Sequence, residues 1–164
     1  MGRNVRALTL REVTALMKTI TGEGVTDRRI RYLLIGGRLG ADVDARAHGR
    51  TRLYGSLDVA LVRLALALRT EGVSPQLTRV VLTYLRAELV RAWRSGAPLG
   101  VALRGMQATL EPAIKGRPPR TDAWVPLRTI WQGLDSRVQE VADERDEVWM
   151  YRPVRAATVP RNTV

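Results

Sequence analysis

Hydrophobic residues recur every three or four positions along several stretches of the chain, which is the spacing of one face of an α-helix. The first stretch carries Leu10, Val13, Leu16, Met17 and Ile20. Thr9 precedes this stretch and Glu12 follows three residues later, which is the capping-box pattern of a helix start. The pattern therefore predicts a first helix from residue 10 onwards, interrupted by the stretch 21–25, which contains two glycines.

A second, shorter helix is predicted after this interruption, with Thr26 as its N-cap and Gly36-Gly37 as its end. Its apolar face carries Ile30, Leu33 and Leu34. The remaining surface of the helix carries Arg28, Arg29, Arg31 and Tyr32. Two helices joined by a tight turn, the second of them rich in arginine, predict a helix-turn-helix.

Residues 38–54 change character and predict a hairpin with a long polar tip. Turn-forming residues are frequent here, namely Gly40, Asp42, Asp44 and Gly49. The segment 50–54 then predicts a strand, in which Arg50 and Arg52 face the same side because side chains alternate along a strand. We interpret Asp42 and Asp44 as turn residues rather than metal ligands.

Two longer helices are predicted next. Ser56 is the expected N-cap of the first, and Gly72 closes it. Its core stripe is Leu57, Leu61, Leu64 and Leu68. Ser74-Pro75 predicts the start of the other helix, which runs to about Arg94. The apolar stripe of that helix is broad and comprises Leu77, Val80, Val81, Tyr84, Leu85, Leu89 and Trp93.

The last third of the chain carries a weaker pattern. Apolar residues alternate over 101–110, which predicts a strand or a bent pair of strands. Residues 115–120 are expected to form a turn or linker, and 127–141 an amphipathic helix. Val148 to Val154 predicts a final strand, and a loose tail is expected from residue 156.

Together these elements predict a mainly α protein: a winged helix-turn-helix with a long following helix and a small α+β C-terminal extension. The expected winged helix-turn-helix domain spans residues 8–73. A connecting or dimerisation helix occupies 74–95, the C-terminal α+β unit 97–155, and the loose tail 156–164.

The charge of the chain narrows the choice of partner. The formal net charge is +11, and only Lys18 and Lys115 among the 27 basic residues are lysines. A basic excess of this size suggests a polyanionic partner, and arginine binds phosphates and guanine edges bidentately. A GC-rich genome would explain the preference for arginine over lysine, but it would not explain the surplus of basic over acidic residues.

Several functional classes are excluded or disfavoured by residue type. The chain has no cysteine and a single histidine, His48, so we expect no metal site and no cofactor. No nucleophile–base pair or GxxxxGK[ST] loop stands out, and the acidic run 140–147 is the only candidate for an enzymatic site, so we do not expect an enzyme. Since no apolar run approaches the length of a membrane span, we expect a soluble cytoplasmic protein without a membrane partner.

Three segments resemble the MerR family of bacterial transcription regulators. Gly24-Val25-Thr26-Asp27-Arg28-Arg29-Ile30-Arg31-Tyr32 looks like the start of that family's recognition helix, and Arg52-Leu53-Tyr54 like its wing. Asp58 with the following leucines and Gly72-Val73-Ser74 resembles its third helix and turn. The resemblance covers roughly residues 9–94. The chain departs from the pattern in a longer first segment before Gly24 and in Leu33, Arg38 and Arg50-Thr51.

The helix-turn-helix reading and the resemblance together indicate DNA-contacting residues. These are Thr26, Arg28, Arg29, Arg31, Tyr32, Arg50, Arg52 and Tyr54. Side chains at the start of a recognition helix reach base edges, which applies to Thr26, Arg28 and Arg29. The resemblance implies backbone contacts for Arg31, Tyr32, Arg52 and Tyr54, while Arg50 is a candidate because it shares a strand face with Arg52.

The resemblance further implies a homodimer, because members of the family dimerise through a long helix after the winged domain. The candidate dimerisation residues are Leu77, Val81, Tyr84, Leu85 and Leu89. The alternative is that 75–94 is an ordinary core helix. A contact with RNA polymerase is also implied by the resemblance. The tryptophans at 124, 131 and 149 either line an effector site or fill the core of the C-terminal unit.

The function expected from the sequence is sequence-specific binding of double-stranded DNA by a MerR-like transcriptional regulator. An alternative is an excisionase-like or architectural DNA-binding factor of a mobile element or chromosome. A protein-only adaptor is a further alternative, which predicts no salt-dependent affinity for DNA.

Overall fold

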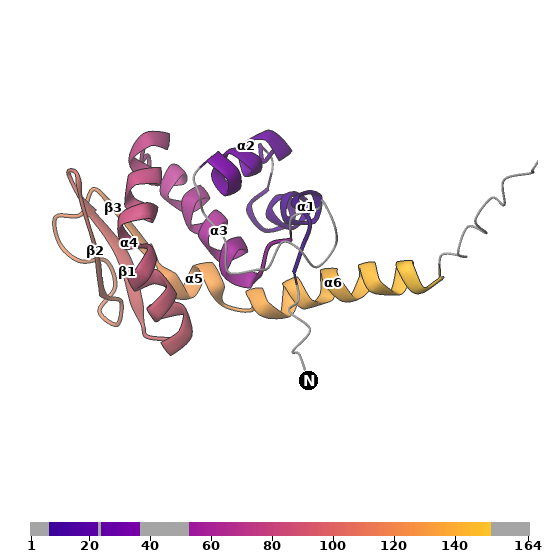
Figure 1. Cartoon of the computed structure of the whole chain (residues 1–164). Helices are drawn as coiled ribbons and strands as arrows, with labels where there is room; N and C mark the ends of the chain where they lie inside the picture. Colours follow the sequence, from indigo (N-terminus) through magenta and orange to yellow (C-terminus); the bar gives the residue numbers. More distant parts are fainter. Residues whose placement is uncertain (1–6, 23, 37–52, 152–164) are drawn as a thin grey trace, which may run out of the picture.

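The computed structural model describes residues 7–22, 24–36 and 53–151, and the side chains of these residues as far as 145, with the exception of residues 35 and 36. Within these ranges the protein is mostly helical, with one small antiparallel sheet (Figure 1). The helices are α1 (Leu10–Thr21), α2 (Asp27–Arg31), the π-helical turn η1 (Tyr32–Gly36), α3 (Ser56–Thr70), α4 (Pro75–Ser95), α5 (Leu127–Trp131) and α6 (Leu134–Tyr151). The strands are β1 (Leu99–Arg104), β2 (Gln107–Pro112) and β3 (Ala123–Pro126).

The helix starts follow the capping signals of the sequence. The Thr9 and Glu12 side chains exchange hydrogen bonds with each other's backbone N–H groups, which completes the predicted capping box of α1. Ser74 accepts a hydrogen bond from the Leu77 N–H at the start of α4, as predicted. Helix α3 begins one residue earlier than expected: Gly55 rather than Ser56 is its N-cap, and the buried Asp58 carboxylate accepts the Gly55 N–H at 3.2 Å.

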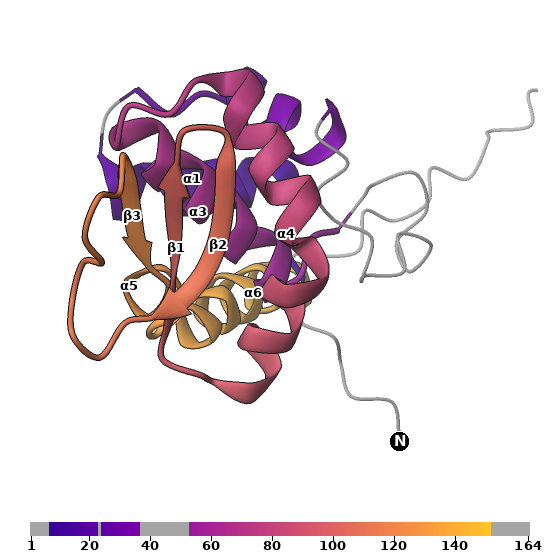
Figure 2. The same ribbon diagram turned by 90° about the vertical axis from the view of Figure 1, so that its left-hand side faces the viewer.

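The sheet lies at one end of the molecule, in the order β2-β1-β3 (Figure 2). The alternation over 101–110 is confirmed as a hairpin of β1 and β2, in which Val101 pairs with Leu110. Strand β3 was not predicted, and it pairs with the other side of β1 through Val101 and Val125. Helices lie behind the sheet in this view, so one face of the sheet packs on the helical part of the chain.

Two predictions for the C-terminal third are wrong. The expected single helix over 127–141 is divided into α5 and α6, because Gly133 adopts the left-handed conformation with φ +71°. The expected strand from Val148 is helical as far as Tyr151, because α6 continues to that residue. Residues 152–154 of that expected strand and the expected tail 156–164 lie outside the described residues, as does the expected hairpin tip at 38–52.

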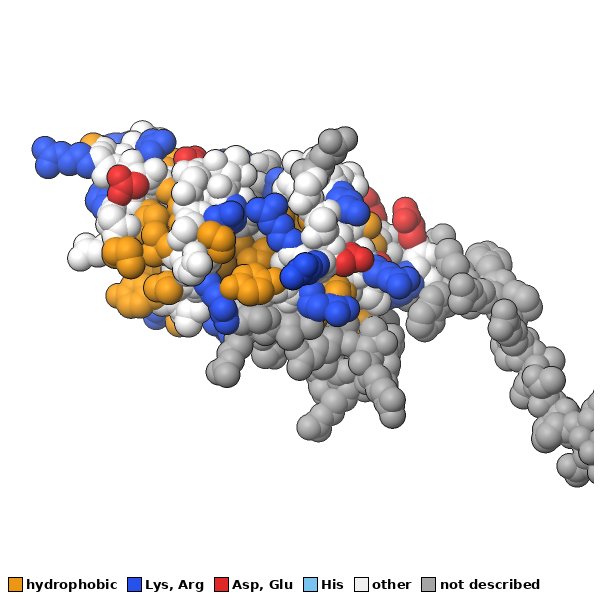
Figure 3. Space-filling view, turned by 90° about the horizontal axis from the view of Figure 1, so that it is seen from above, with side chains coloured by type: hydrophobic (Ala, Val, Ile, Leu, Met, Phe, Trp, Pro, Cys, Tyr) orange, Lys and Arg blue, Asp and Glu red, His pale blue; other side chains and the backbone are white. Residues whose placement is uncertain are grey.

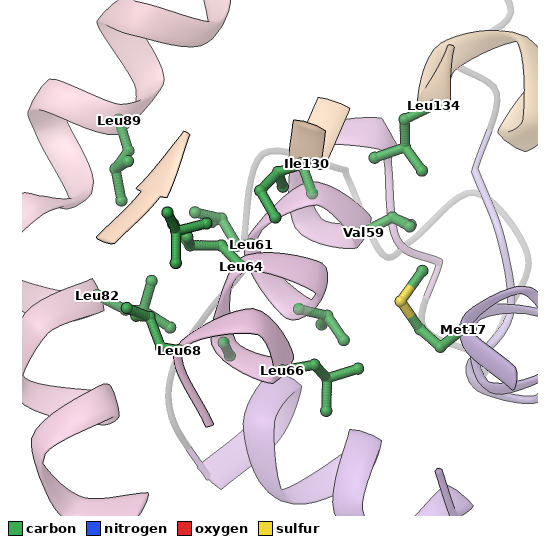
Figure 4. Packing of buried hydrophobic residues seen from close by; sticks show 14 of the residues in the cluster. Met17, Val59, Leu61, Leu64, Leu66, Leu68, Leu82, Leu89, Ile130 and Leu134 are labelled. Carbon is green, nitrogen blue, oxygen red and sulfur yellow. The ribbon is translucent and has the colours of Figure 1, made fainter. Parts of the chain in front are cut away.

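Helix α3 forms the centre of the core. Leu61, Leu64 and Leu68 lie on its side toward α4, where Leu82 and Leu89 approach them (Figure 4). On the other side of α3, Val59 lies toward Met17 of α1 (Figure 4). The buried residues form one cluster that extends from Leu8 to Ala142, so the elements on both sides of the expected boundary at 96 share a core.

The C-terminal helix α6 contacts the residues at the start of the described chain. Helix α6 extends along one side of the molecule beneath α1 (Figure 1). Arg145 of α6 donates hydrogen bonds to the Ala7 carbonyl at 2.9 Å and to Glu12 Oε2 at 3.1 Å. In the described part of the chain, none of the helices is both long and apolar enough to cross a membrane.

Candidate nucleic-acid interface

The segment from Thr26 to Tyr32 presents a basic surface, and buried residues within and beside it attach it to the core. Val25 and Ile30 are buried, with Ile30 fully inaccessible to solvent, and they fasten the segment to the core. The Thr26 hydroxyl accepts a hydrogen bond from the Arg29 N–H at 3.2 Å, which caps α2. The side of the helix opposite Ile30 is therefore presented to solvent, and Arg28, Arg29 and Arg31 are all exposed.

Helix α2 follows α1 after a short turn, and the two helices pack against each other. Gly22 ends α1 with φ +88°, and Gly24 also has a positive φ of +95°. These backbone conformations favour glycine, so the interruption predicted at 21–25 coincides with the observed turn. The sequence therefore located both the turn and the start of the basic helix.

Tyr32 has a partner that the sequence analysis did not identify. The guanidinium carbon of Arg79 on α4 lies 5.5 Å from the centre of the Tyr32 ring, and Arg79 Nη1 donates to the Tyr32 hydroxyl at 3.3 Å. The Tyr32 side chain is still 46% exposed. The contact adds a fourth arginine to the basic surface, which we call the basic face: Thr26, Arg28, Arg29, Arg31, Tyr32 and Arg79. The only sequence signal for Arg79 is its position among polar residues on one side of α4.

The predicted wing is described only at its end. Arg50 and Arg52 lie outside the described residues, and Tyr54 forms an antiparallel bridge with Leu8 through two backbone hydrogen bonds of 2.8 Å. The Tyr54 side chain is buried at 6% exposure. Its position is that of a core residue, whereas a contact with DNA requires an accessible hydroxyl.

The candidate dimerisation residues lie on two different sides of α4. Val81, Leu85 and Leu89 are buried against the chain's own α3, which corresponds to the alternative reading of α4 as a core helix. Leu77 is half-buried. Tyr84 is 74% exposed, and the neighbouring Val80, which was not among the candidates, is 57% exposed. The apolar surface that α4 offers to another molecule is therefore formed by Val80 and Tyr84.

Arg63 and Arg69 of α3 form a second group of basic side chains, near Arg29. Arg63 of α3 donates to the Ile130 carbonyl at 2.7 Å, and it lines a surface hollow of about 560 Å³ together with Arg29, Arg69 and Trp124. Burial lowers the pKa of the Arg63 guanidinium, and the positive charge of Arg137 lowers it further. Arg63 thus links α3 to the end of α5.

The acidic run of the C-terminal third does not form a metal site within the described residues. Glu140, Asp143 and Glu144 are exposed along α6, as expected for a solvated helix face. In the described part of the chain, no group of three His, Cys, Asp or Glu side chains is positioned to hold a metal ion. Trp124 is buried, and Trp131 packs edge-to-face on Trp93 with ring centres 5.4 Å apart. Both rings pack against other parts of the chain, and Trp124 also lines the hollow beside Arg63. The side chain of Trp149 lies outside the described residues.

Comparisons with known protein families, with curated proteins and with solved structures found no match for this chain.

Proposed function

We propose that the protein binds duplex DNA through its basic face and acts as a transcriptional regulator of the winged helix-turn-helix kind. The observation that carries this proposal is the exposure of Arg28, Arg29 and Arg31 on a short helix that is capped by Thr26 and anchored by Ile30. Because the backbone of this helix is already capped and anchored, little backbone freedom is lost on binding, which favours a specific contact over a diffuse one. The net charge of +11 supports a polyanionic partner.

In this proposal the residues of the basic face have different tasks. Thr26, Arg28 and Arg29 lie at the start of α2 and read base edges in the major groove. Arg31 and Tyr32 contact phosphates, and Arg79 adds a phosphate contact from α4 while it holds the Tyr32 ring. Arg50 and Arg52 of the predicted wing would fix the orientation of the protein on DNA.

The proposed regulator is a homodimer that reads two half-sites. Val80 and Tyr84 support this part of the proposal, because they are large apolar side chains exposed one helical turn apart on α4. They lie beside Arg79 of the basic face, so a second copy packed there would bring two basic faces close to one DNA duplex. Dimer symmetry would then be matched by symmetry of the operator.

The test is duplex DNA affinity at two salt concentrations, measured with a selected high-affinity sequence and with a scrambled one. The variant is Arg28→Ala/Arg29→Ala, which retains the backbone cap at Thr26. The matched control is Arg91→Ala/Arg94→Ala, which removes two exposed arginines from the other end of α4. At 1.5 Å per residue, Arg91 lies roughly 18 Å along the helix from Arg79, the residue of α4 that belongs to the basic face.

We expect the wild type and the control to prefer the selected sequence. The Arg28→Ala/Arg29→Ala variant should lose that preference. The slope of log affinity against log salt should change little, because these two arginines are assigned to base edges and the phosphate contacts come from other residues. Equal binding of all duplexes by every variant would favour the architectural DNA-binding factor. No binding at low salt would contradict the proposal and favour a protein-only adaptor.

A further inference from the structure

A cavity of about 410 Å³ opens directly behind the basic face, between α2, η1, α3 and α4. Its apolar wall is formed by Leu33 of η1, Leu66 of α3 and Pro75 of α4. Seen from above, this side of the molecule has hydrophobic side chains surrounded by basic ones (Figure 3). A volume of this size that combines an apolar wall with polar side chains at its edge is typical of sites for small organic molecules.

The charges that line the cavity are all positive. Arg28, Arg29 and Arg69 line it, and no acidic side chain of the described residues does. Arg69 is half-buried and held in place, because its Nη1 donates to the Val73 carbonyl at 2.8 Å. A guanidinium that is fixed in position and partly removed from water binds a carboxylate or sulfonate more strongly than a freely moving one. The charge of the cavity therefore selects an anion.

The inner wall carries a polar group without a partner. Thr78 of α4 lines the cavity, is 1% exposed, and its hydroxyl makes no hydrogen bond within the described part of the chain. Such a buried hydroxyl lowers stability because its desolvation is not compensated. Threonine populates two χ1 rotamers in a helix, so rotation about χ1 can move the hydroxyl to a second position. A ligand with a hydrogen-bonding group can thus be met by Thr78.

We propose that this cavity, which we call the α2–α4 pocket, binds a small organic anion with an aromatic or aliphatic body, and that the bound anion weakens DNA binding. Leu33, Leu66 and Pro75 would contact the body, while Arg69 and Arg28 would contact the anionic group. The effect on DNA rests on the proposed function, because Thr26, Arg28 and Arg29 belong to both the pocket and the basic face. Binding of the anion itself is independent of DNA.

The first experiment measures binding without DNA. The probe is naphthoate, titrated against the full chain by calorimetry, and the comparison ligand is naphthalenemethanol, which has a similar shape and no charge. We expect the wild type to bind naphthoate saturably at one site. Its affinity for naphthalenemethanol should be about tenfold lower, and so should the affinity of the Arg69→Gln and Arg28→Gln variants for naphthoate. Arg91→Gln is the control, since it removes an exposed arginine outside the pocket.

A variant of Thr78 tests whether its unpaired hydroxyl contacts the ligand or is only a destabilising buried group. Thr78→Val replaces the unpaired hydroxyl by a methyl group of similar size, so we expect the protein to unfold at a higher urea concentration while its affinity for naphthoate decreases. Higher stability with unchanged affinity would show that Thr78 serves only as a wall. Since Arg28 is exposed, Arg28→Gln tests the charge requirement even if Arg69→Gln lowers stability through the lost Val73 contact.

Absence of saturable naphthoate binding, or equal affinities for the charged and uncharged ligands, would overturn the proposed pocket. The effect on DNA is read in a separate titration, in which naphthoate should weaken the DNA affinity of the wild type and have less effect on Arg69→Gln. Naphthoate binding with unchanged DNA affinity would overturn only the coupling. If the protein binds naphthoate but no DNA, the proposed function fails and the pocket stands.

Discussion

Single residues of the basic face differ in how far the sequence could identify them. Arg28, Arg29 and Arg31 were predicted from the pattern of α2, because Ile30 fixes which side of a short helix is buried. Arg79 was missed, because it meets Tyr32 from a position 47 residues away. Tyr54 was expected at the DNA and is buried, because an isolated β-bridge pairs it with Leu8 within the core.

The ion pair of the hairpin gives a prediction for acid stability. Glu111 accepts hydrogen bonds from Arg104 on the paired strand and from Thr109, with an Arg104 Nη2 to Glu111 Oε1 distance of 3.0 Å. The Arg104 hydrogen bond, followed by that of Thr109, lowers the pKa of the Glu111 carboxyl. This contribution to stability is present above the ordinary glutamate pKa and is lost as the pH falls through the lowered value.

We therefore expect Glu111→Gln to lower the melting temperature slightly at neutral pH and not at a pH below the lowered pKa. The effect is small because the pair is partly exposed and screened by solvent. The measurement is thermal unfolding of both proteins across the acidic range. A difference in melting temperature that does not change with pH would contradict the assignment.

At the scale of elements, the packing of the Trp124 ring against β1 requires a glycine at position 100. The Trp124 ring of β3 lies over Gly100 of β1 so closely that a Cβ atom on Gly100 would overlap the ring. We expect Gly100→Ala to lower the free energy of unfolding by about 1–3 kcal/mol, because the added methyl group forces the ring to move. Urea denaturation of the variant measures the loss.

The matched control combines the glycine change with a smaller neighbour. In a Trp124→Leu background the added methyl group has space, so Gly100→Ala should cost less there than in the wild type. Equal costs in both backgrounds would show that the strain does not come from Trp124. The sequence did not indicate this contact, because it did not predict β3.

At the scale of the whole molecule, Arg145 holds the C-terminal helix to the start of the chain. Its contacts to the Ala7 carbonyl and Glu12 join residues more than 130 positions apart, and both charged side chains are mostly buried. We expect Arg145→Ala to lower the free energy of unfolding by about 1–3 kcal/mol, since it leaves Glu12 and a backbone carbonyl without this donor. Urea denaturation measures the change.

Glu140→Ala serves as the comparison, because Glu140 is an exposed residue on the same helix. It should change stability by no more than about 0.5 kcal/mol. If the two variants lose equal stability, the removal of any charged side chain from α6, rather than the Arg145 contact, accounts for the effect. The shared core from Leu8 to Ala142 leads us to expect one cooperative unfolding transition.

The sequence by itself determined the helices from α1 to α4, the turn before α2 and the exposed arginines that follow it. Caps, glycine turns and helical periodicity act over a few residues, so a local pattern contains them. Only the tertiary structure decided which side of α4 is buried, with Val81, Leu85 and Leu89 inside and Val80 and Tyr84 exposed. It also decided that Arg79 contacts Tyr32 and that a cavity lies behind the basic face. These features arise where distant segments pack together, and their geometry depends on how α3 brings those segments into contact.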